Sequence, residues 1–420
     1  MIFLIIILLI ITISSLLLLF WTAIRKNNYW KNRGIPGPEP LPLKGNIDLI
    51  FGNKNPLSIY GIKNGWFNVL VVSEPELVKE LLVDKFEYFH GRAHCPIVGD
   101  VDTSKLIHLF LAKGKRWKRL RSIANPAFSI SNLKRIMPII EDSIKININL
   151  LKEAESSGKC VDLHEYFVEL TFDVIVRIAM GQKDSKQFKS EYCQIAQDSF
   201  TRINNNIFYY IAFIFPWIGE NILKPFSNAT GKLRGDPILI AHNLVIYPQV
   251  QKRLFEEIEE ICGLEEETID FEQLAKLKYA DAVFKETQRL CPIANDVVNR
   301  KCEETTTLGD IKIEKGIYVY ADLFTLHRDK KIWGEDAEEF KPERWLSNDY
   351  IPTEYYYPFG GGPRICIGMR LAMMEVKMVL VHLLRSFELK RCSETLVKPN
   401  LTGHVVLNSG KIVVKLNLRK

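Results

Sequence analysis

The sequence lacks a paired-cysteine motif, although it contains eight cysteines. No two of them are spaced as C-x-x-C, so the sequence contains neither a zinc module nor a recognisable disulfide framework. This pattern favours a location on the reducing, cytosolic side of any membrane. The cysteines are Cys95, Cys160, Cys193, Cys262, Cys291, Cys302, Cys366 and Cys392.

Side-chain charge is absent from the first 23 residues. The stretch from Met1 to Ala23 is long enough to cross a bilayer as a helix, and it has neither a basic segment before it nor a small-x-small cleavage site. Basic residues follow it, which places the rest of the chain in the cytosol. We therefore predict a single-pass transmembrane anchor over residues 1–24, with a cleaved signal peptide as the alternative. The basic residues are Arg25, Lys26, Lys31 and Arg33.

Repeats are also absent, and only one segment is biased in composition. Residues 25–44 include the run from Gly34 to Pro42, in which fixed proline dihedrals favour a stiff, extended connector. The chain of 420 residues is 47% hydrophobic, which is enough for a large core, so we predict one globular domain over residues 45–420. The net charge of +6 is compatible with an anionic membrane surface, an acidic partner or nucleic acid.

Strand patterns are few, so the predicted fold class is mainly α with a minor β region. They cover Val69–Val72, Ile311–Ala321 with a break at Lys315-Gly316, and Val405–Leu418 with a turn at Asn408-Ser409-Gly410. Helical patterns fill most of the remainder. Ser73-Glu74-Pro75-Glu76 opens one helix, and a buried helix follows Gly368.

The strongest motif is PFGGGPRICIG, which runs from Pro358 to Gly368 directly into that helix. A phosphate-binding loop would require a Lys-Ser/Thr pair after the glycines, and none is present. Cys366 stands where the helix begins, and backbone N–H groups and the positive helix end stabilise a thiolate there. Such a thiolate can be the axial ligand of a haem iron. The alternative is a buried, inert thiol.

The pattern F-x-x-G-x-R-x-C-x-G resembles the haem-binding signature of the cytochrome P-450 family. Phe359, Gly362, Arg364, Cys366 and Gly368 fill its positions. The resemblance implies a P-450-like fold and a bound iron protoporphyrin, haem b, with Cys366 as the iron ligand. It implies that the other four residues also belong to the cofactor site.

Two further segments resemble the Glu-x-x-Arg helix of this family and its Pro-Glu-Arg-aromatic segment. Glu286 and Arg289 stand at i, i+3, where they can pair on one helix face, and Pro342-Glu343-Arg344-Trp345 supplies Arg344. The resemblance implies a buried triad of Glu286, Arg289 and Arg344 that supports the cysteine loop, and a solvated surface pair is the alternative. His327 matches another recurring family segment, and we predict a structural histidine there.

Trp117 and Arg121 stand at i, i+4 and resemble a family helix that binds a haem propionate. Indole and guanidinium groups are suitable donors to a carboxylate. Arg364, Arg300 and, more loosely, Arg92 match positions that bracket propionates in relatives, and a surface charge is the alternative for each. The basic stretch around Trp117 predicts an amphipathic helix with its aromatic side chain turned inward, and we expect no nucleic-acid binding.

The resemblance also implies an activity and its partners. The expected reaction is the insertion of one oxygen atom into an apolar small molecule of the xenobiotic, steroid or fatty-acid class. The electrons would come from NADPH through a flavoprotein reductase at the endoplasmic reticulum membrane, where charge complementarity guides docking. Substrate contacts are expected from residues 97–111, 200–213, 292–298 and 401–407.

The chain departs from the family pattern at two places, so the predicted fold is incomplete. One gap precedes Tyr60, and the other lies between Phe226 and Tyr247, where relatives have the helix that carries an acid-Thr pair. Because oxygen activation needs protons from positioned hydroxyl and carboxyl groups, no catalytic residue is identified beyond the haem ligand. Two alternatives stay open: a haem-binding but catalytically impaired protein, and a membrane scaffold without haem.

Overall fold

The computed structural model describes most of the chain, which divides into two compact units. The first unit comprises residues 1–120, 203–229 and 298–325, and the second comprises residues 121–202, 230–297 and 326–420. The single domain expected after the connector stays a prediction. The described residues are 2–46, 57–96, 99, 101–102, 109–190, 207–223, 238–266, 268–293, 297–347, 352–399, 401 and 409–419.

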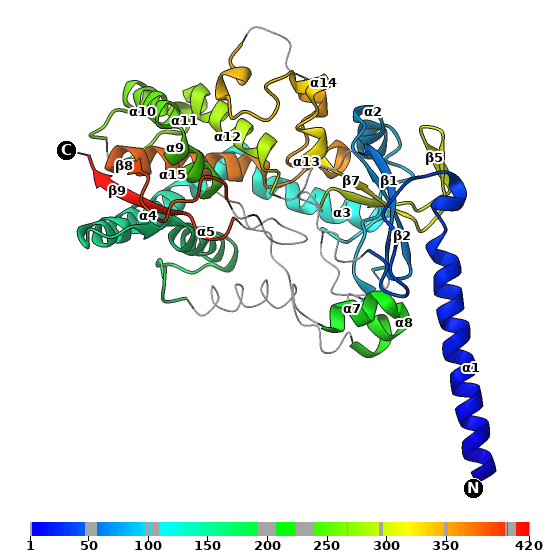
Figure 1. Cartoon of the computed structure of the whole chain (residues 1–420). Coiled ribbons are helices and arrows are strands. Elements are labelled where there is room, and N and C mark those ends of the chain that lie inside the picture. Colours follow the sequence, from blue (N-terminus) through cyan, green and yellow to red (C-terminus); the bar gives the residue numbers. More distant parts are fainter. Residues whose placement is uncertain are drawn as a thin grey trace. The chain divides into compact units, whose positions relative to one another are not determined.

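The first unit contains a four-stranded sheet in the order β1-β2-β7-β4. β1 (Ile59–Asn64) and β2 (Phe67–Val72) form an antiparallel hairpin, and β7 (Tyr318–Ala321) runs parallel to β2 (Figure 1). β4 (Asn299–Lys301) pairs antiparallel with β7. All four residues of β7 are buried, as a central strand covered on both faces requires.

The strands predicted around β2 and β7 are confirmed. β6 (Ile311–Ile313) ends just before the predicted break and pairs with β5 (Thr306–Leu308) in a sheet of its own. β1 was not predicted from the sequence. Its first half alternates poorly, because four of its six residues are buried in a row.

A long apolar helix begins the first unit. α1 (Ile2–Asn27) is the one helix among the described residues that is long and apolar enough to cross a membrane. Directly after it, Trp30 is buried, and its Nε1 donates to the carbonyl oxygen of Ile62 at 3.1 Å. A Cβ atom at Gly61 would lie 2.1 Å from Cγ of Trp30, so only glycine leaves space for the indole. The end of α1 is therefore fixed to strand β1.

The second unit is a helical core built on α15 (Met369–Ser386), which begins directly after Gly368 as predicted. Residues 374–384 of α15 are buried, and the helix packs against α4 (Ile130–Ser156), α10 (Pro248–Cys262) and α12 (Lys278–Leu290). A small sheet of order β3-β9-β8 borders this core. Its β9 (Val413–Leu418) falls within the predicted strand, of which residues 402–408 lie outside the described part.

The remaining elements complete the two units. The first unit also contains α2 (Pro75–Lys79), η2 (Glu80–Asp84), α7 (Ile207–Ile214), α8 (Pro216–Ile218), η5 (Gly219–Leu223) and η1 (Lys31–Arg33). α3 (Gly114–Ala124) runs from the first unit into the second, and α13 (Leu323–Leu326) does the same. The second unit also contains η4 (Asn125–Phe128), β3 (Val161–Asp162), α5 (Leu163–Met180), α9 (Ile238–Ile246), α11 (Phe271–Lys276), α14 (Lys330–Trp333), η8 (Pro342–Trp345), η9 (Thr353–Tyr355), η10 (Gly362–Arg364) and β8 (Phe387–Lys390). The mainly α fold class with a minor β region is confirmed.

Replacing Gly61 with alanine tests the attachment of α1 to the sheet. The added methyl group would overlap the indole of Trp30, and we expect a loss of about 1–3 kcal/mol in the free energy of unfolding. Limited proteolysis should also cut residues 31–44 faster. Ile59→Val in the same strand is the control, and equal proteolysis of the two variants would contradict the role of this contact.

Candidate functional site

The cysteine loop, residues 358–368, is a series of turns that places Cys366 just before α15. Gly360 and Gly362 have φ angles of 73° and 62°, in the left-handed region that glycine adopts without strain. The N–H group of Cys366 donates to the carbonyl oxygen of Phe359 at 2.9 Å, which closes the loop. The Cys366 side chain itself is exposed. The loop therefore presents an accessible thiol three residues before an 18-residue helix.

The surroundings of the sulfur favour a negative charge. Nη1 of Arg121 donates to the carbonyl oxygen of Ile365 at 2.9 Å, which brings its guanidinium beside the loop. Partial burial lowers the pKa of Arg121, and the charge of the Cys366 sulfur acts on this pKa in the opposite direction. A cation and a helix N-terminus both stabilise a thiolate. A Cβ atom at Gly368 would lie 4.0 Å from the Cys366 sulfur, so this glycine is in van der Waals range of the thiol.

Glu286 and Arg289 form a fully buried ion pair on α12. Nε and Nη2 of Arg289 donate to the two carboxylate oxygens of Glu286 at 2.9 and 2.8 Å, and both side chains are 0% exposed. Nη1 of Arg289 also donates to the carbonyl oxygens of His327 and Ala337 at 2.7 and 2.6 Å. Each charge is thus compensated by a partner and by hydrogen bonds, as a stable buried pair requires.

Three further groups complete the coordination of the Glu286 carboxylate. The N–H group of Lys341 donates to Oε1 at 3.0 Å, and Nε1 of Trp345 donates to Oε2 at 2.9 Å. Nε of Arg344 lies 3.5 Å from Oε1, while its Nη2 pairs with Asp336 at 2.9 Å. The structure therefore places the three predicted triad residues in one cluster, in which Arg289 is the main partner of Glu286 and Arg344 binds mostly elsewhere.

His327 connects this cluster to the cysteine loop. It is fully buried, and its Nε2 accepts a hydrogen bond from the N–H group of Tyr357 at 3.1 Å, one residue before the loop begins. Burial, together with the charges of Arg289 and Arg328, lowers the pKa of His327 to about 3. The neutral ring can therefore act as an acceptor at every physiological pH.

Aromatic contacts hold the loop against α12. The rings of Phe284 and Phe359 stack with centroids 6.0 Å apart, and the hydroxyl of Tyr356 donates to the carbonyl oxygen of Lys285 at 3.0 Å. Tyr356 also packs on Trp345, with ring centroids 4.7 Å apart. Sequence reasoning missed Phe284 and Tyr356, because a pattern along the chain contains no signal for contacts more than 70 residues apart.

The first unit contains three of the predicted residues: Trp117, Arg300 and Arg92. Trp117 is buried on α3 against Phe86, with ring centroids 5.6 Å apart, so the inward aromatic of this helix is confirmed. Arg300 is 1% exposed on β4, and Arg92 stands opposite it by the bridge that joins Gly91 to Lys301. These residues belong to the first unit, whereas Cys366, Arg364 and Arg121 belong to the second. Arg364 is buried at the end of η10.

The basic stretch beside Trp117 is less exposed than the sequence suggests. Lys113 pairs with Asp102 at 3.1 Å and with Glu303 at 2.9 Å. Its hydrogen bonds to these carboxylates outweigh its burial and raise its pKa. Lys113 is therefore occupied by carboxylates of the first unit. Any acidic partner would contact the other basic side chains of α3.

An accessible thiol directly before a buried helix is compatible with a haem-thiolate protein, in which a cysteine sulfur binds the haem iron. The sequence model of the family described as Cytochrome P450 matches residues 36–235 and 239–416. The chain therefore belongs to the cytochrome P450 family. This membership identifies it as an oxidoreductase of the monooxygenase type, a family with cysteine-ligated haem iron.

Three relatives from Caenorhabditis elegans extend over nearly the whole chain. Cytochrome P450 CYP13A7 and cytochrome P450 CYP13A4 are each 33% identical over 497 residues, covering 93% of this chain and 95% of the relative. Cytochrome P450 cyp-13B1 is 32% identical over 492 residues, covering 94% and 96%. Since 93% of 420 residues is about 390, roughly a hundred of the 497 positions aligned with CYP13A7 have no residue of this chain opposite them.

The residues present fit a haem iron. The donor is a soft sulfur that is exposed, carries no disulfide and lies next to a guanidinium and a helix N-terminus. Its own backbone N–H group is bonded to Phe359, which fixes the backbone at the sulfur-bearing residue. The stretches proposed for substrate contact fall largely on residues 97–98, 103–108, 200–206, 294–296 and 402–407, which lie outside the described part.

Replacing Arg289 with methionine should be strongly destabilising. The change leaves the Glu286 carboxylate buried without its main partner, and we expect a loss of about 3–5 kcal/mol in urea unfolding. Arg253→Met is the matched control, because Arg253 pairs with Glu343 at 2.8 Å while half-exposed, and it should cost about 1 kcal/mol or less. Similar losses in the two variants would show that burial of the Glu286 pair is unimportant.

His327 should make the stability of the protein fall in acid. Its folded-state pKa of about 3 lies below the ordinary 6.5, so its contribution is complete above pH 6.5 and is lost as the pH falls towards 3. Between pH 7 and pH 5 the wild-type protein should lose about 2 kcal/mol more unfolding free energy than His327→Gln, which cannot titrate. Denaturant unfolding at both pH values measures this difference, and identical pH slopes would contradict it.

Proposed function

We propose that Cys366 is the thiolate ligand of haem b in a membrane-anchored monooxygenase. The observation that carries this proposal is the accessible thiol at the start of α15, in a loop held by the buried Glu286–Arg289 pair. The substrate would be an apolar small molecule of the xenobiotic, steroid or fatty-acid class. Electrons would come from NADPH through a flavoprotein reductase, as the resemblance to microsomal members suggests.

The residues around the sulfur would hold its charge and position. Haem iron, when bound to such a thiolate, supplies the oxygen-activating chemistry of the family. Arg121 and the N-terminus of α15 would keep the Cys366 sulfur deprotonated, and Phe359 would fix the loop by stacking on Phe284. Gly362 and Gly368 would keep the backbone close and free of bulk. The propionate donors would be Arg121, Arg364, Trp117, Arg300 and Arg92.

The Glu286–Arg289–Arg344 cluster would act as a positioning group. Hydrogen bonds connect it to the start of the loop through His327 and Tyr357, so its role would be to fix the height and angle of the segment that ends in Cys366. Arg344 would hold the segment around Asp336 and Trp333 in place, since its Nη atoms bond there.

The location would be the endoplasmic reticulum membrane, with the globular part in the cytosol. The length and apolar surface of α1 support an anchor, because its large side chains between Phe3 and Trp21 are mostly exposed in the isolated chain. The basic residues that follow α1 support the cytosolic side.

A second function is favoured by the gap between Phe226 and Tyr247. The family match breaks there, between residues 235 and 239, and over the whole alignment roughly a hundred positions lack a residue of this chain opposite them. In the described part of this range, α9 contains neither an acidic residue nor a threonine. The chain would then bind haem but release most of the activated oxygen as peroxide, because proton delivery and water exclusion would fail. Peroxide yield per NADPH, measured with added reductase, separates this protein from an efficient monooxygenase.

The Cys366→Ala variant tests the proposed iron ligand. Without the sulfur, the band that a thiolate-bound haem gives in the reduced carbon monoxide difference spectrum should disappear. Cys392→Ala removes another partly exposed thiol of the second unit and should leave the band unchanged. A band that survives in Cys366→Ala, or is missing from the wild-type chain loaded with haem, would refute the assignment and favour a scaffold without haem.

A further inference from the structure

Two lysines from separate elements meet at one tryptophan near the end of α1. Nζ of Lys26, on α1, lies 4.6 Å from the centroid of the Trp66 ring, and Nζ of Lys63, on β1, lies 5.8 Å from it. Lys26 is exposed, whereas Lys63 is only 2% exposed. Trp66 lies in the turn between β1 and β2 and is half-buried. These contacts all fall within the first unit.

Within the part of the chain that the structure describes, the two ammonium groups have no compensating carboxylate. Among the described residues, no carboxylate forms an ion pair with Lys26 or Lys63, and Lys26 is the charge that acts on Lys63. Burial and then repulsion by Lys26 lower the pKa of Lys63 to about 8. A buried cation facing a second cation is unfavourable unless an anion joins them. The arrangement therefore matches a ligand that carries a negative charge.

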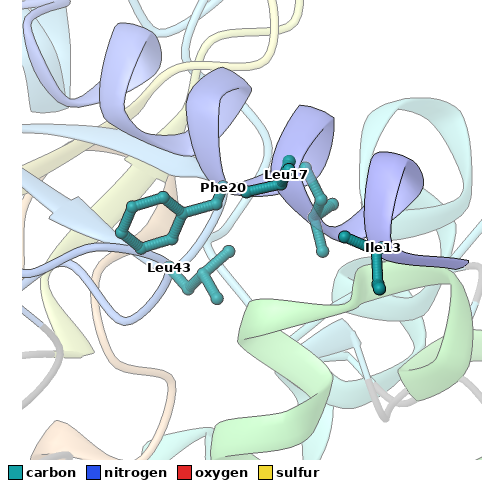
Figure 2. Close-up of a pocket in the computed structure, with 5 residues that line it drawn as sticks. Ile13, Leu17, Phe20 and Leu43 are labelled. Atoms are coloured by element: carbon teal, nitrogen blue, oxygen red, sulfur yellow. The ribbon is translucent and has the colours of Figure 1, made fainter. Parts of the chain in front are cut away.

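An apolar groove lies beside α1, and its lining residues in this helix precede Lys26 along the chain. It is lined by Ile13, Leu17, Leu19 and Phe20 of α1 and by Leu43 of the connector. Figure 2 shows the side chains of Phe20 and Leu43 facing each other across it. Phe20 precedes Lys26 by six residues, which is about 9 Å along a helix. A ligand that reaches both features would need an anionic head and a long apolar tail.

We propose that Lys26, Lys63 and Trp66 bind the phosphate headgroup of one anionic glycerophospholipid, whose acyl chain lies in the groove between α1 and Leu43. The placement fits a bilayer, because Lys26 follows the apolar stretch directly and tryptophan is favoured at the membrane interface. The proposal rests on the membrane anchor proposed above. It adds a defined lipid site that joins the anchor to the β1–β2 hairpin.

Lipid retention by the detergent-solubilised full chain tests this site. Native mass spectrometry would compare retained phosphatidylserine with phosphatidylcholine, and the wild type should prefer phosphatidylserine. Lys26→Gln should weaken phosphatidylserine retention about five-fold, since one cation near an anionic lipid contributes that much. Lys31→Gln is the matched control, because Lys31 is an exposed cation five residues further on, and it should change retention less than two-fold.

Because Lys63 is buried, the lipid retention of Lys63→Met is interpreted only if its unfolding curve matches that of the wild type. If Lys63→Met is unstable, the exposed Lys26→Gln decides the test. Equal effects of Lys26→Gln and Lys31→Gln would overturn the site in favour of diffuse surface charge. Competition by millimolar inorganic phosphate as strong as that by phosphatidylserine would also overturn it, since a free anion would then suffice. Flotation of the chain with phosphatidylcholine vesicles measures the anchor separately, so an anchor without lipid preference refutes the site alone.

Discussion

The buried ion pair between Glu286 and Arg289 is the interaction on which the cysteine loop depends. Neither side chain has exposed surface, so each charge must be compensated inside the protein. Arg289 binds backbone carbonyl groups at residues 327, 337 and 339, and Glu286 binds the segment at residues 341–345. One helix thereby fixes two irregular segments that have little regular structure of their own.

The consequence for chemistry is a thiol that is accessible yet held in place. The N–H group of Tyr357 donates to His327, which holds the residue that precedes the loop. Phe284 stacks on Phe359 and holds the loop itself. A neutral imidazole suits this position, because a charged ring could not accept the N–H group of Tyr357. A backbone hydrogen bond from Cys366 to Phe359 closes the loop. Membership of the cytochrome P450 family agrees with this arrangement.

In the first unit, α1 is held to the sheet in a different way. Trp30 is fixed against Gly61 by packing and by a hydrogen bond to the backbone, so α1 is joined to the sheet by shape complementarity. Lys63 lies two residues further along the same strand, where burial and the charge of Lys26 lower its pKa. One strand thus combines tight packing with a cation that has no ion-pair partner among the described residues. In the second unit, by contrast, the buried charges of Glu286 and Arg289 compensate each other.

The sequence by itself determined the features that are local along the chain. The motif around Cys366, the start of α15, the i, i+3 spacing of Glu286 and Arg289 and the apolar α1 all follow from short patterns. Only the tertiary structure decided that Trp345 and the N–H group of Lys341 complete the Glu286 site, that Lys113 faces two carboxylates, and that Lys26 meets Lys63. Apart from the pair of Lys113 and Asp102, which are 11 positions apart, these contacts join residues 37 to 190 positions apart. Their partners are chosen by packing and desolvation, which a local pattern does not encode.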